Sequence, residues 1–242
     1  AHIFCNTIKT SSNIGSIEAI LNNKSYPVFN FRKKGNSESK ITDNEYLEYV
    51  RKAKEHCKRG DVFQLVLSRR FMQKFSGDEF NVYRALRSIN PSPYLFFFDY
   101  GDYKIFGSSP EAQIIIKDGK SEIHPIAGTF KRTGNDEEDH NAAKELAKDP
   151  KENSEHIMLV DLARNDLSRS GNNVKVEKNR EIQFYSHVIH LVSKVSCTMK
   201  KATKTFRVVA DTFPAGTLSG APKHRALQLI DQYETTKRNV YG

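Results

Sequence analysis

The pattern of apolar and polar positions predicts a helix over residues 149–167. Asp149 is suited to cap this helix and Pro150 to begin it, and Glu152 lies where a capping-box carboxylate reaches back. An apolar block follows at 157–162. This block predicts that most sides of the helix are covered by the rest of the protein.

Two acidic residues lie at the edge of this apolar block. Glu152 and Glu155 are three residues apart, so they share one face of the helix. Converging carboxylates repel each other unless a cation or a proton lies between them. The spacing is therefore compatible with a metal site. The alternative is that the glutamates simply offset the helix dipole.

The remaining elements follow from hydrophobic periodicity and turn residues. Thr42 and Glu45 form a capping-box pattern at the start of one helix. The predicted helices are 42–60, 79–87, 134–148, 202–212 and 222–233, and the predicted strands are 62–71, 94–99, 103–106, 112–117, 121–125, 173–184 and 187–199. We expect the four strands between 94 and 125 to form a meander.

The order of these elements indicates an α+β fold with a largely antiparallel β-sheet core and helices outside. Residues 1–41 have a mixed pattern with a polar run at 33–40, which predicts a lead-in with one strand and a linker. Residues 42–242 then form the main domain.

Composition limits the function classes. The chain has 242 residues, and no apolar run approaches the ~20 residues of a membrane span. Its three cysteines lack CxxC spacing, which favours a reducing, cytoplasmic compartment over a zinc site or disulfide framework. The net charge of +9 arises from basic residues interleaved with acidic ones. This pattern favours an anionic metabolite over nucleic acid, although a basic nucleic-acid binder remains an alternative.

The loop at 213–223 is a candidate ligand site. Gly216 and Gly220 would let the backbone approach a ligand, and Thr217 and Ser219 offer hydroxyl groups. A helix begins directly after the loop, and free N–H groups at a helix start favour an anion. The glycine–lysine spacing is not that of a Walker loop. An ordinary turn before a helix is the alternative.

Three further positions carry candidate chemistry. Glu111 follows a predicted strand end, and a carboxylic acid in a closed cleft can be held protonated as a general acid. Gly128 and Thr129 combine flexibility and a hydroxyl at another strand end. His187 and His190 lie three apart on a strand, so only one can point inward.

Seven segments in this order resemble the chorismate-utilising enzymes, most closely the large subunit, component I, of anthranilate synthase. They are residues 60–70, 90–95, 107–111, 125–129, 155–167, 185–190 and 213–223. The resemblance covers about 42–242 and implies that family's β-sandwich core flanked by helices. It also implies a reaction of chorismate with ammonia that gives anthranilate and pyruvate.

The resemblance implies roles for individual residues. Glu152 and Glu155 match one half of a Mg²⁺ site that holds the ring carboxylate of chorismate. Glu111 matches a general acid for the leaving ring hydroxyl, His190 a residue for the loss of pyruvate, and Thr217 a catalytic cleft position. The implied substrate-binding residues are Gln64, Gly128, Thr129, Gly216 and Tyr241.

Two other positions bear on the branch of the family. Gln64 replaces the lysine of isochorismate and salicylate synthases that activates water. Ala127 replaces the lysine that many aminodeoxychorismate synthases carry, although some of these enzymes also have alanine there. Aminodeoxychorismate synthase component I, in the folate pathway, therefore remains an alternative.

The resemblance also implies regulation and a partner. A tryptophan feedback site would include Asn90, Pro93, Tyr94 and Leu95, although a rigid turn before a strand explains these residues equally well. A glutamine amidotransferase subunit, component II, would deliver ammonia.

Family members continue beyond position 242, with a substrate arginine and a second pair of magnesium glutamates. We therefore expect a C-terminally truncated chain that cannot catalyse the full reaction alone. A non-catalytic docking module for the glutaminase subunit is a further alternative.

Overall fold

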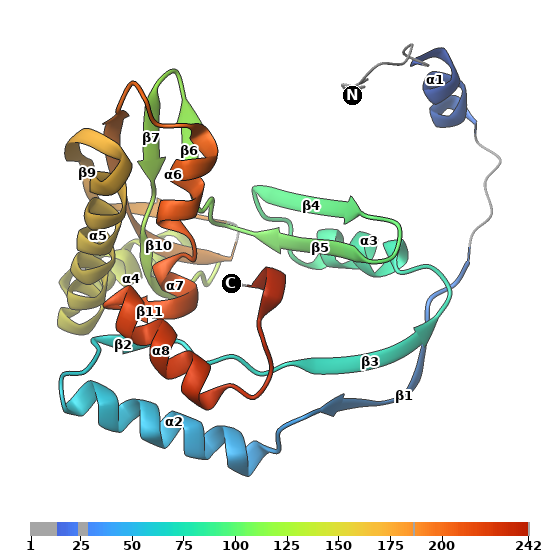
Figure 1. Cartoon of the computed structure of the whole chain (residues 1–242), viewed down its shortest axis with the longest axis horizontal. Coiled ribbons are helices and arrows are strands. Elements are labelled where there is room, and N and C mark those ends of the chain that lie inside the picture. Colours follow the sequence, from blue (N-terminus) through green and yellow to red (C-terminus); the bar gives the residue numbers. More distant parts are fainter. Residues whose placement is uncertain (1–13, 24–28, 186, 242) are drawn as a thin grey trace.

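The structure is a computed structural model that describes residues 14–23, 29–185 and 187–241 (Figure 1). The predicted lead-in therefore lies partly outside the described residues, as do Ser186 in one family segment and the terminal Gly242.

A five-stranded sheet is the centre of the fold. Its middle strand, β10 (Val188–Met199), pairs with β9 (Gly171–Phe184), β7 (Lys120–Ile123) and β8 (Ile126–Lys131), and β6 (Ile115–Lys117) pairs with β7. All of these described pairs are antiparallel. The predicted strand pair at 173–184 and 187–199 is thus confirmed as β9 and β10.

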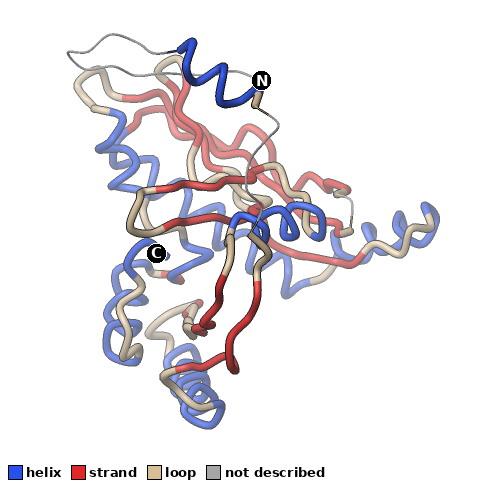
Figure 2. Tube along the Cα trace, turned by 90° about the vertical axis from the view of Figure 1, so that its right-hand side faces the viewer, coloured by secondary structure: helices blue, strands red, loops and turns tan. Residues whose placement is uncertain are grey.

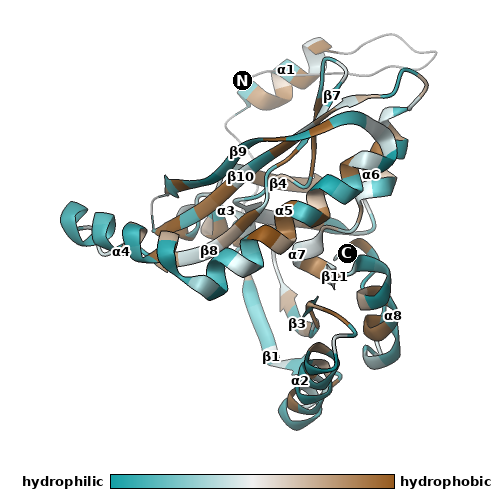
Figure 3. Ribbon diagram, turned by 90° about the vertical axis from the view of Figure 1, so that its left-hand side faces the viewer, coloured by the Kyte–Doolittle hydropathy of each residue, from teal (hydrophilic) through white to brown (hydrophobic). Residues whose placement is uncertain are grey.

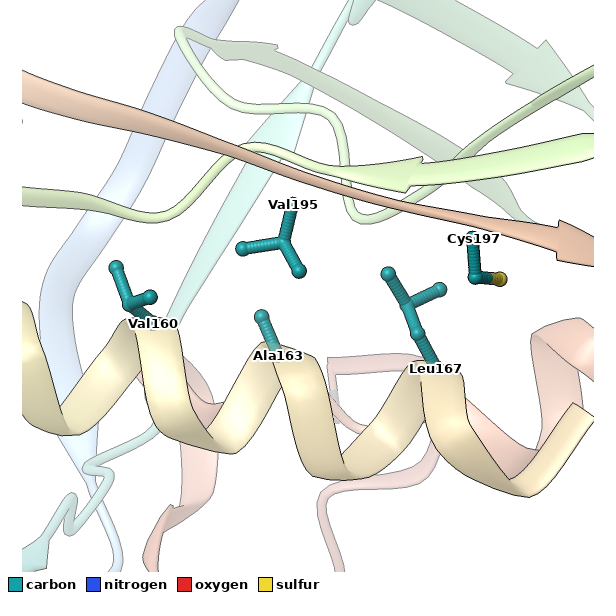
Figure 4. Packing of buried hydrophobic residues seen from close by; sticks show 5 residues of the cluster. All are labelled: Val160, Ala163, Leu167, Val195 and Cys197. Carbon is teal, nitrogen blue, oxygen red and sulfur yellow. The ribbon is translucent and has the colours of Figure 1, made fainter. Parts of the chain in front are cut away.

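Helix α5 (Pro150–Ser170) packs on this sheet and forms the main core. Val160, Ala163 and Leu167 of the helix meet Val195 and Cys197 of β10 (Figure 4). Figure 3 shows the hydrophobic residues that run along β10 beside α5. The core therefore fixes the helix against the strand by direct side-chain packing.

A second helix, α4 (Asp136–Lys148), extends this core. Its Ala143 and Leu146 pack against Ile189 and Leu191 of β10. The side chain of Asn135 caps the helix by accepting hydrogen bonds from Glu137 N and Glu138 N. The predicted helix at 134–148 is confirmed.

The other strands form two-stranded pairs. These are β1 (Arg32–Ser39) with β3 (Phe71–Ser76), β4 (Tyr94–Asp99) with β5 (Lys104–Ser109), and β2 (Gln64–Leu65) with β11 (Gly220–Ala221). Helix α3 (Phe80–Ile89) covers the β4–β5 pair through tilted and edge-on aromatic rings. The β1–β3 pair and helix α2 lie below the five-stranded sheet in both overall views (Figure 1, Figure 2).

The helix α2 (Asp43–Lys58) begins at the predicted capping box. Glu45 N donates to Thr42 Oγ1 at 3.2 Å, and Thr42 N donates to Glu45 Oε2 at 2.7 Å. The remaining helices are α1 (Ile14–Asn22), α6 (Thr205–Thr212), α7 (Gly216–Ser219), α8 (Lys223–Tyr233) and the 3₁₀ turn η1 (Asn239–Tyr241). None of the described helices is long and apolar enough to cross a membrane.

The α+β class with antiparallel strands is confirmed, but several elements differ from the prediction. The single strand at 62–71 is wrong, because the chain pairs first with β11 and then with β1. The polar run at 33–40 is an exposed strand rather than a linker, and β8 was not predicted. The four-strand meander is also wrong, because β4–β5 and β6–β7 belong to different sheets.

The prediction for the surface of α5 was wrong in part. Ile157 is 58% exposed, although it belongs to the apolar block of this helix. The sheet covers one side of the helix and leaves Ile157 on another.

The core makes a stability prediction. Leu167→Ala should destabilise the chain by about 2–5 kcal/mol, because the side chain is fully buried between α5 and β10 and its removal leaves a cavity. Urea unfolding followed by circular dichroism measures the change. Leu47→Ala is the matched control, since Leu47 is 52% exposed on α2 and should change stability by under about 0.5 kcal/mol. Equal effects of the two substitutions would contradict this account of the core.

Candidate active site

The start of α5 has the predicted cap and proline, but Asp149 N donates to Leu146 O at 3.3 Å, so the expected capping-box role of Glu152 is wrong. Asp149 accepts hydrogen bonds from Lys151 N at 2.8 Å and Glu152 N at 2.9 Å, and Pro150 occupies the first turn. These caps set where the helix begins. They place Glu152 and Glu155 in the first turns of α5, before the core residues that begin at Val160. Both glutamates are partly buried.

Each glutamate lies beside another predicted site residue. Gln64 of β2 donates from Nε2 to Glu155 Oε1 at 3.2 Å. A Cβ built on Gly128 of β8 would lie 3.5 Å from the Cβ of Glu152 and 2.9 Å from Leu146 Cδ1. Gly128 has a φ of +80°. Both the backbone conformation and the close approach of α4 and α5 therefore favour glycine at this position.

The oxygen atoms near Glu152 and Glu155 could surround only part of a hard cation such as Mg²⁺. Carboxylate oxygens are the ligands of Mg²⁺, which commonly uses one or two carboxylates together with water and substrate. Gln64 Oε1, on the amide that contacts Glu155, is a buried oxygen without a hydrogen-bond partner and adds a possible oxygen ligand. No group of three His, Cys, Asp or Glu side chains in the described residues could hold a metal. Glu152 and Glu155 thus fit part of a magnesium shell.

The predicted histidine lies at the junction of β8 and β10. His190 is 8% exposed, and its Nδ1 lies 3.0 Å from Thr129 Oγ1, directly across the strand pair. The ring also contacts Tyr185 edge-on at 5.3 Å between centroids. His187 precedes β10 and is exposed. Of the two histidines, His190 is therefore the inward one.

Glu111 has the most perturbed environment of the predicted residues. It follows β5, where Ser109 Oγ accepts a hydrogen bond from Glu111 N at 3.2 Å. Burial raises the pKa of Glu111 to about 7, because the surroundings disfavour the charged carboxylate. Near neutral pH this side chain can both give and take a proton.

Two cavities meet at Glu111. One, of about 130 Å³, is also lined by Pro93, Tyr94 and Tyr185. The other, of about 30 Å³, contains Thr217 and lies against α5. Glu111 therefore connects the α7 segment with the turn that precedes β4.

The glycines of the 213–223 loop lie where neighbouring elements approach the loop closely. A Cβ on Gly216 would lie 2.1 Å from Leu162 Cδ2, and one on Gly220 would lie 2.2 Å from Gln64 O. These glycines allow α5 and β2 to approach the loop, so neither needs a ligand to explain it. The loop also folds into the short helix α7 and strand β11 rather than a simple turn.

Some predicted residues lie outside the two cavities at Glu111. Tyr241 is 55% exposed, packs over the Arg238 guanidinium and lines a separate cavity of about 330 Å³. Of the four residues of the expected tryptophan site, Pro93 and Tyr94 reach the cavity at Glu111. Asn90 holds the turn instead, since its carbonyl accepts from Ser108 Oγ at 2.6 Å, and Leu95 belongs to β4.

The structure adds polar residues that the sequence did not single out. Asp166 and Gln113 line the small cavity at Glu111, and Lys223 forms an ion pair with Asp166 at 2.6 Å. His156 is fully buried and its Nε2 lies 2.6 Å from Ser193 Oγ. The available signal for His156 and Asp166 was that these polar residues share the helical spacing of the buried apolar positions of α5.

Residues 6–242 match the family described as chorismate binding enzyme, so the chain belongs to that family.

Two relatives carry the name of one branch of this family. The chain is 46% identical over 209 residues to anthranilate synthase component 1 of Aquifex aeolicus, which covers 86% of this chain and 42% of that protein. It is 46% identical over 206 residues to the protein of the same name from Bacillus subtilis, which covers 84% of this chain and 40% of that protein. The resemblance to component I is confirmed.

A solved structure agrees with these sequence relatives. The crystal structure of anthranilate synthase component I from Streptococcus pneumoniae matches with a TM-score of 0.80 at 36% identity, over 93% of this chain and 51% of that chain. The chain thus spans about half the length of the proteins it matches, or somewhat less.

The environment of Glu111 predicts an unusual titration. Its carboxyl should titrate with a midpoint of about 7, while that of Glu45 should titrate below its ordinary range because Thr42 hydrogen bonds stabilise its charge. Carbon-13 NMR of labelled glutamate side chains measures both, with Glu111→Gln for assignment.

The same shift affects stability. The folded chain holds this proton more tightly than the unfolded chain, so the contribution is complete below pH 4.5 and is lost as the pH rises to about 7. Glu111→Gln should therefore gain stability relative to the wild type over that range. A constant difference at all pH values would contradict the raised pKa.

Proposed function

We propose that the full-length protein is an anthranilate synthase component I. It would convert chorismate and ammonia into anthranilate, pyruvate and water, with ammonia released from glutamine by a glutamine amidotransferase subunit. The relatives of that name at 46% identity support the branch. The observation in the chain itself that carries the proposal is Glu111, a partly buried acid that can hold a proton near pH 7.

Glu111 would act in the first step. Protonated Glu111 donates its proton to the ring hydroxyl of chorismate, which leaves as water while ammonia forms the new carbon–nitrogen bond. A carboxyl with an ordinary pKa would hold almost no proton at neutral pH. The burial of Glu111 therefore suits it to this role.

His190 would act in the second step. A ring carbon loses its proton to His190, and the electron pair restores the aromatic ring as the bond to the enolpyruvyl oxygen breaks. The released enolpyruvyl group takes up a proton and becomes pyruvate. Thr129, across the strand pair from His190, supports this role because its hydroxyl fixes the orientation of the imidazole.

The remaining predicted residues would bind the substrate. Glu152 and Glu155 would hold part of a Mg²⁺ shell, and the ion would offset the charge of the ring carboxylate when bound. Gln64 would fix the position of Glu155, and Thr217 would line the cleft beside Glu111. Gly128 and Gly216 would allow the surrounding elements to close around the site, and Tyr241 would lie farther out.

The turn before β4 would connect this site with regulation. We place Asn90, Pro93, Tyr94 and Leu95 in a tryptophan feedback site. Pro93 and Tyr94 line the same cavity as Glu111, so a ligand that moves the turn would change the surroundings of the general acid. This shared cavity is the support for the assignment.

Substitution of the acid tests the proposed reaction. Glu111→Gln in the full-length protein should lower kcat by about 10²–10⁴-fold with little change in KM for chorismate, because the amide cannot supply the proton. Anthranilate fluorescence measures turnover with chorismate, magnesium and ammonium. Glu137→Gln, an exposed change on α4, is the control and should keep normal activity. A wild-type protein that makes aminodeoxychorismate instead of anthranilate would refute the proposed branch.

The metal assignment has a separate test. Glu155→Gln should raise the magnesium concentration needed for half-maximal turnover by roughly 10-fold or more, since even partners outside the ligand shell change metal affinity by 10–100-fold. Direct binding of Mn²⁺, followed by electron paramagnetic resonance, should weaken in parallel. Glu145→Gln is the matched control on the exposed side of α4. Unchanged metal affinity in Glu155→Gln would remove this residue from the site.

A further inference from the structure

The strand pair that carries His190 contains a β-bulge. In the register of β8 with β10, Thr129 pairs with His190, and the next pair along β8 is Ala127 with Leu191. Gly128 is therefore the extra residue on β8. Its φ of +80° is one that glycine adopts more readily than other residues. Bulges of this kind redirect the groups beside them and are common next to active sites.

The bulge brings a backbone carbonyl to the His190 ring. Gly128 O lies 3.3 Å from His190 Nδ1, and Thr129 Oγ1 lies 3.0 Å from the same nitrogen. Gly128 and His190 are both buried. Two oxygen atoms from neighbouring residues of β8 therefore meet one nitrogen of the imidazole.

These contacts favour one tautomer of the neutral ring. A carbonyl oxygen can accept a hydrogen bond but cannot donate one. An unprotonated Nδ1 would face the lone pairs of Gly128 O, which is unfavourable for buried polar atoms. A protonated Nδ1 can donate to Gly128 O and Thr129 Oγ1 together, as a shared hydrogen bond. The proton then lies on Nδ1, and Nε2 carries the basic lone pair.

Tyr185 contacts the same imidazole from the connection between β9 and β10. The two rings meet edge-on, at 5.3 Å between centroids and 69° between planes. The tyrosine hydroxyl donates to Gln183 Oε1 at 2.9 Å. Its backbone N–H donates to Val188 O at 2.8 Å, and its carbonyl accepts from Arg132 Nη1 at 3.1 Å. Because Tyr185 is fixed at three atoms, its ring limits rotation of the imidazole.

Arg132 is itself anchored on α4. Its Nε donates to Asp139 Oδ2 at 2.7 Å, and Asp139 is fully buried. The backbone N–H of Arg132 donates to His187 O at 2.9 Å, and its guanidinium lies over the Phe184 ring. One arginine thus ties the connection between β9 and β10, with Tyr185 on it, to the helix.

We propose that the Gly128 bulge and Tyr185 fix His190 as the Nδ1–H tautomer, so that Nε2 is the atom that takes a proton. Tyr185 is a positioning residue, because it acts through the imidazole. The role in turnover rests on the proposed function, in which the proton comes from a ring carbon of chorismate. The tautomer itself does not rest on it.

The fixed tautomer has a direct chemical use. As the carbon–hydrogen bond breaks, its electron pair stays with the substrate ring and the proton bonds to Nε2. The resulting imidazolium keeps its Nδ1–H bond to Gly128 O, so the ring need not turn. That bond also strengthens, because hydrogen bonds from charged donors are stronger than neutral ones.

Nitrogen-15 NMR of the chain, labelled in its histidine side chains, measures the tautomer. At a pH of about 8, where an unperturbed imidazole is neutral, His190 should carry its proton on Nδ1 and none on Nε2. The exposed His224 provides the reference for an unconstrained ring. His190→Gln assigns the signals. A proton on Nε2 of the neutral ring would overturn the proposal, whatever the protein's activity.

Thr129→Val separates the two oxygen atoms at Nδ1. It removes the hydroxyl at an exposed position and leaves the Gly128 carbonyl in place, so the Nδ1–H tautomer should persist. Gly128→Ala is unsuitable, because the added Cβ would lie 2.9 Å from Leu146 Cδ1. A change to the Nε2–H tautomer in Thr129→Val would overturn the role of the bulge, since the hydroxyl would then select the tautomer.

Turnover of the full-length protein tests the role of Tyr185. Tyr185→Leu should lower kcat about 3- to 30-fold while KM for chorismate stays within about twofold, because the imidazole loses its orientation. Tyr185→Phe keeps the ring and should retain kcat within about twofold. The matched control is Tyr100→Leu, since Tyr100 also contacts an aromatic ring but is 57% exposed after β4. It should leave both constants unchanged.

The outcomes separate the two proposals. An unchanged kcat in Tyr185→Leu would refute the positioning role, and so would equal losses in Tyr185→Leu and Tyr185→Phe. Equal losses of kcat and thermal stability in Tyr185→Leu and Tyr100→Leu would also refute it, since general destabilisation would then explain the effect. A wild type with the Nδ1–H tautomer that does not act on chorismate would refute the proposed function alone.

Discussion

The packing of α5 on β10 is the interaction on which the rest of the structure depends. Val160, Ala163 and Leu167 are buried against the strand, and the helix also contacts β7, β8, β9, α6 and α7. Hydrophobic burial of this kind has no preferred direction by itself. The cap at Asp149 fixes the residue at which the helix begins. It therefore helps to set which side chains of the helix face the sheet.

This arrangement has a consequence for the candidate site. At the start of the helix, Glu152 lies beside Gly128 of the same sheet, and Glu155 lies beside Gln64 of β2. The same sheet brings Thr129 and His190 into register on neighbouring strands. One buried interface thus orders both the acidic pair and the histidine, although they are far apart in the sequence.

The two buried acidic residues differ in their partners. Burial raises the pKa of both Glu111 and Asp166, but Asp166 has a cation beside it, Lys223, whose charge opposes the shift. A buried carboxylate without a counter-charge favours its neutral form, and an ion-paired one can remain charged. The two carboxyl groups that line one small cavity therefore differ in whether a counter-charge is present.

The sequence by itself determined the local elements: the capping box at Thr42, the start of α5, the β9–β10 pair and the positions of Glu111 and His190 within their segments. These depend on near neighbours, whose spacing is visible in the chain. Only the tertiary structure decided that the polar run at 33–40 is a strand, that Gly216 makes room for α5, and that Tyr241 lies apart from the other site residues. Those outcomes depend on which distant segments come into contact, and a buried pairing exists only once both partners are in place.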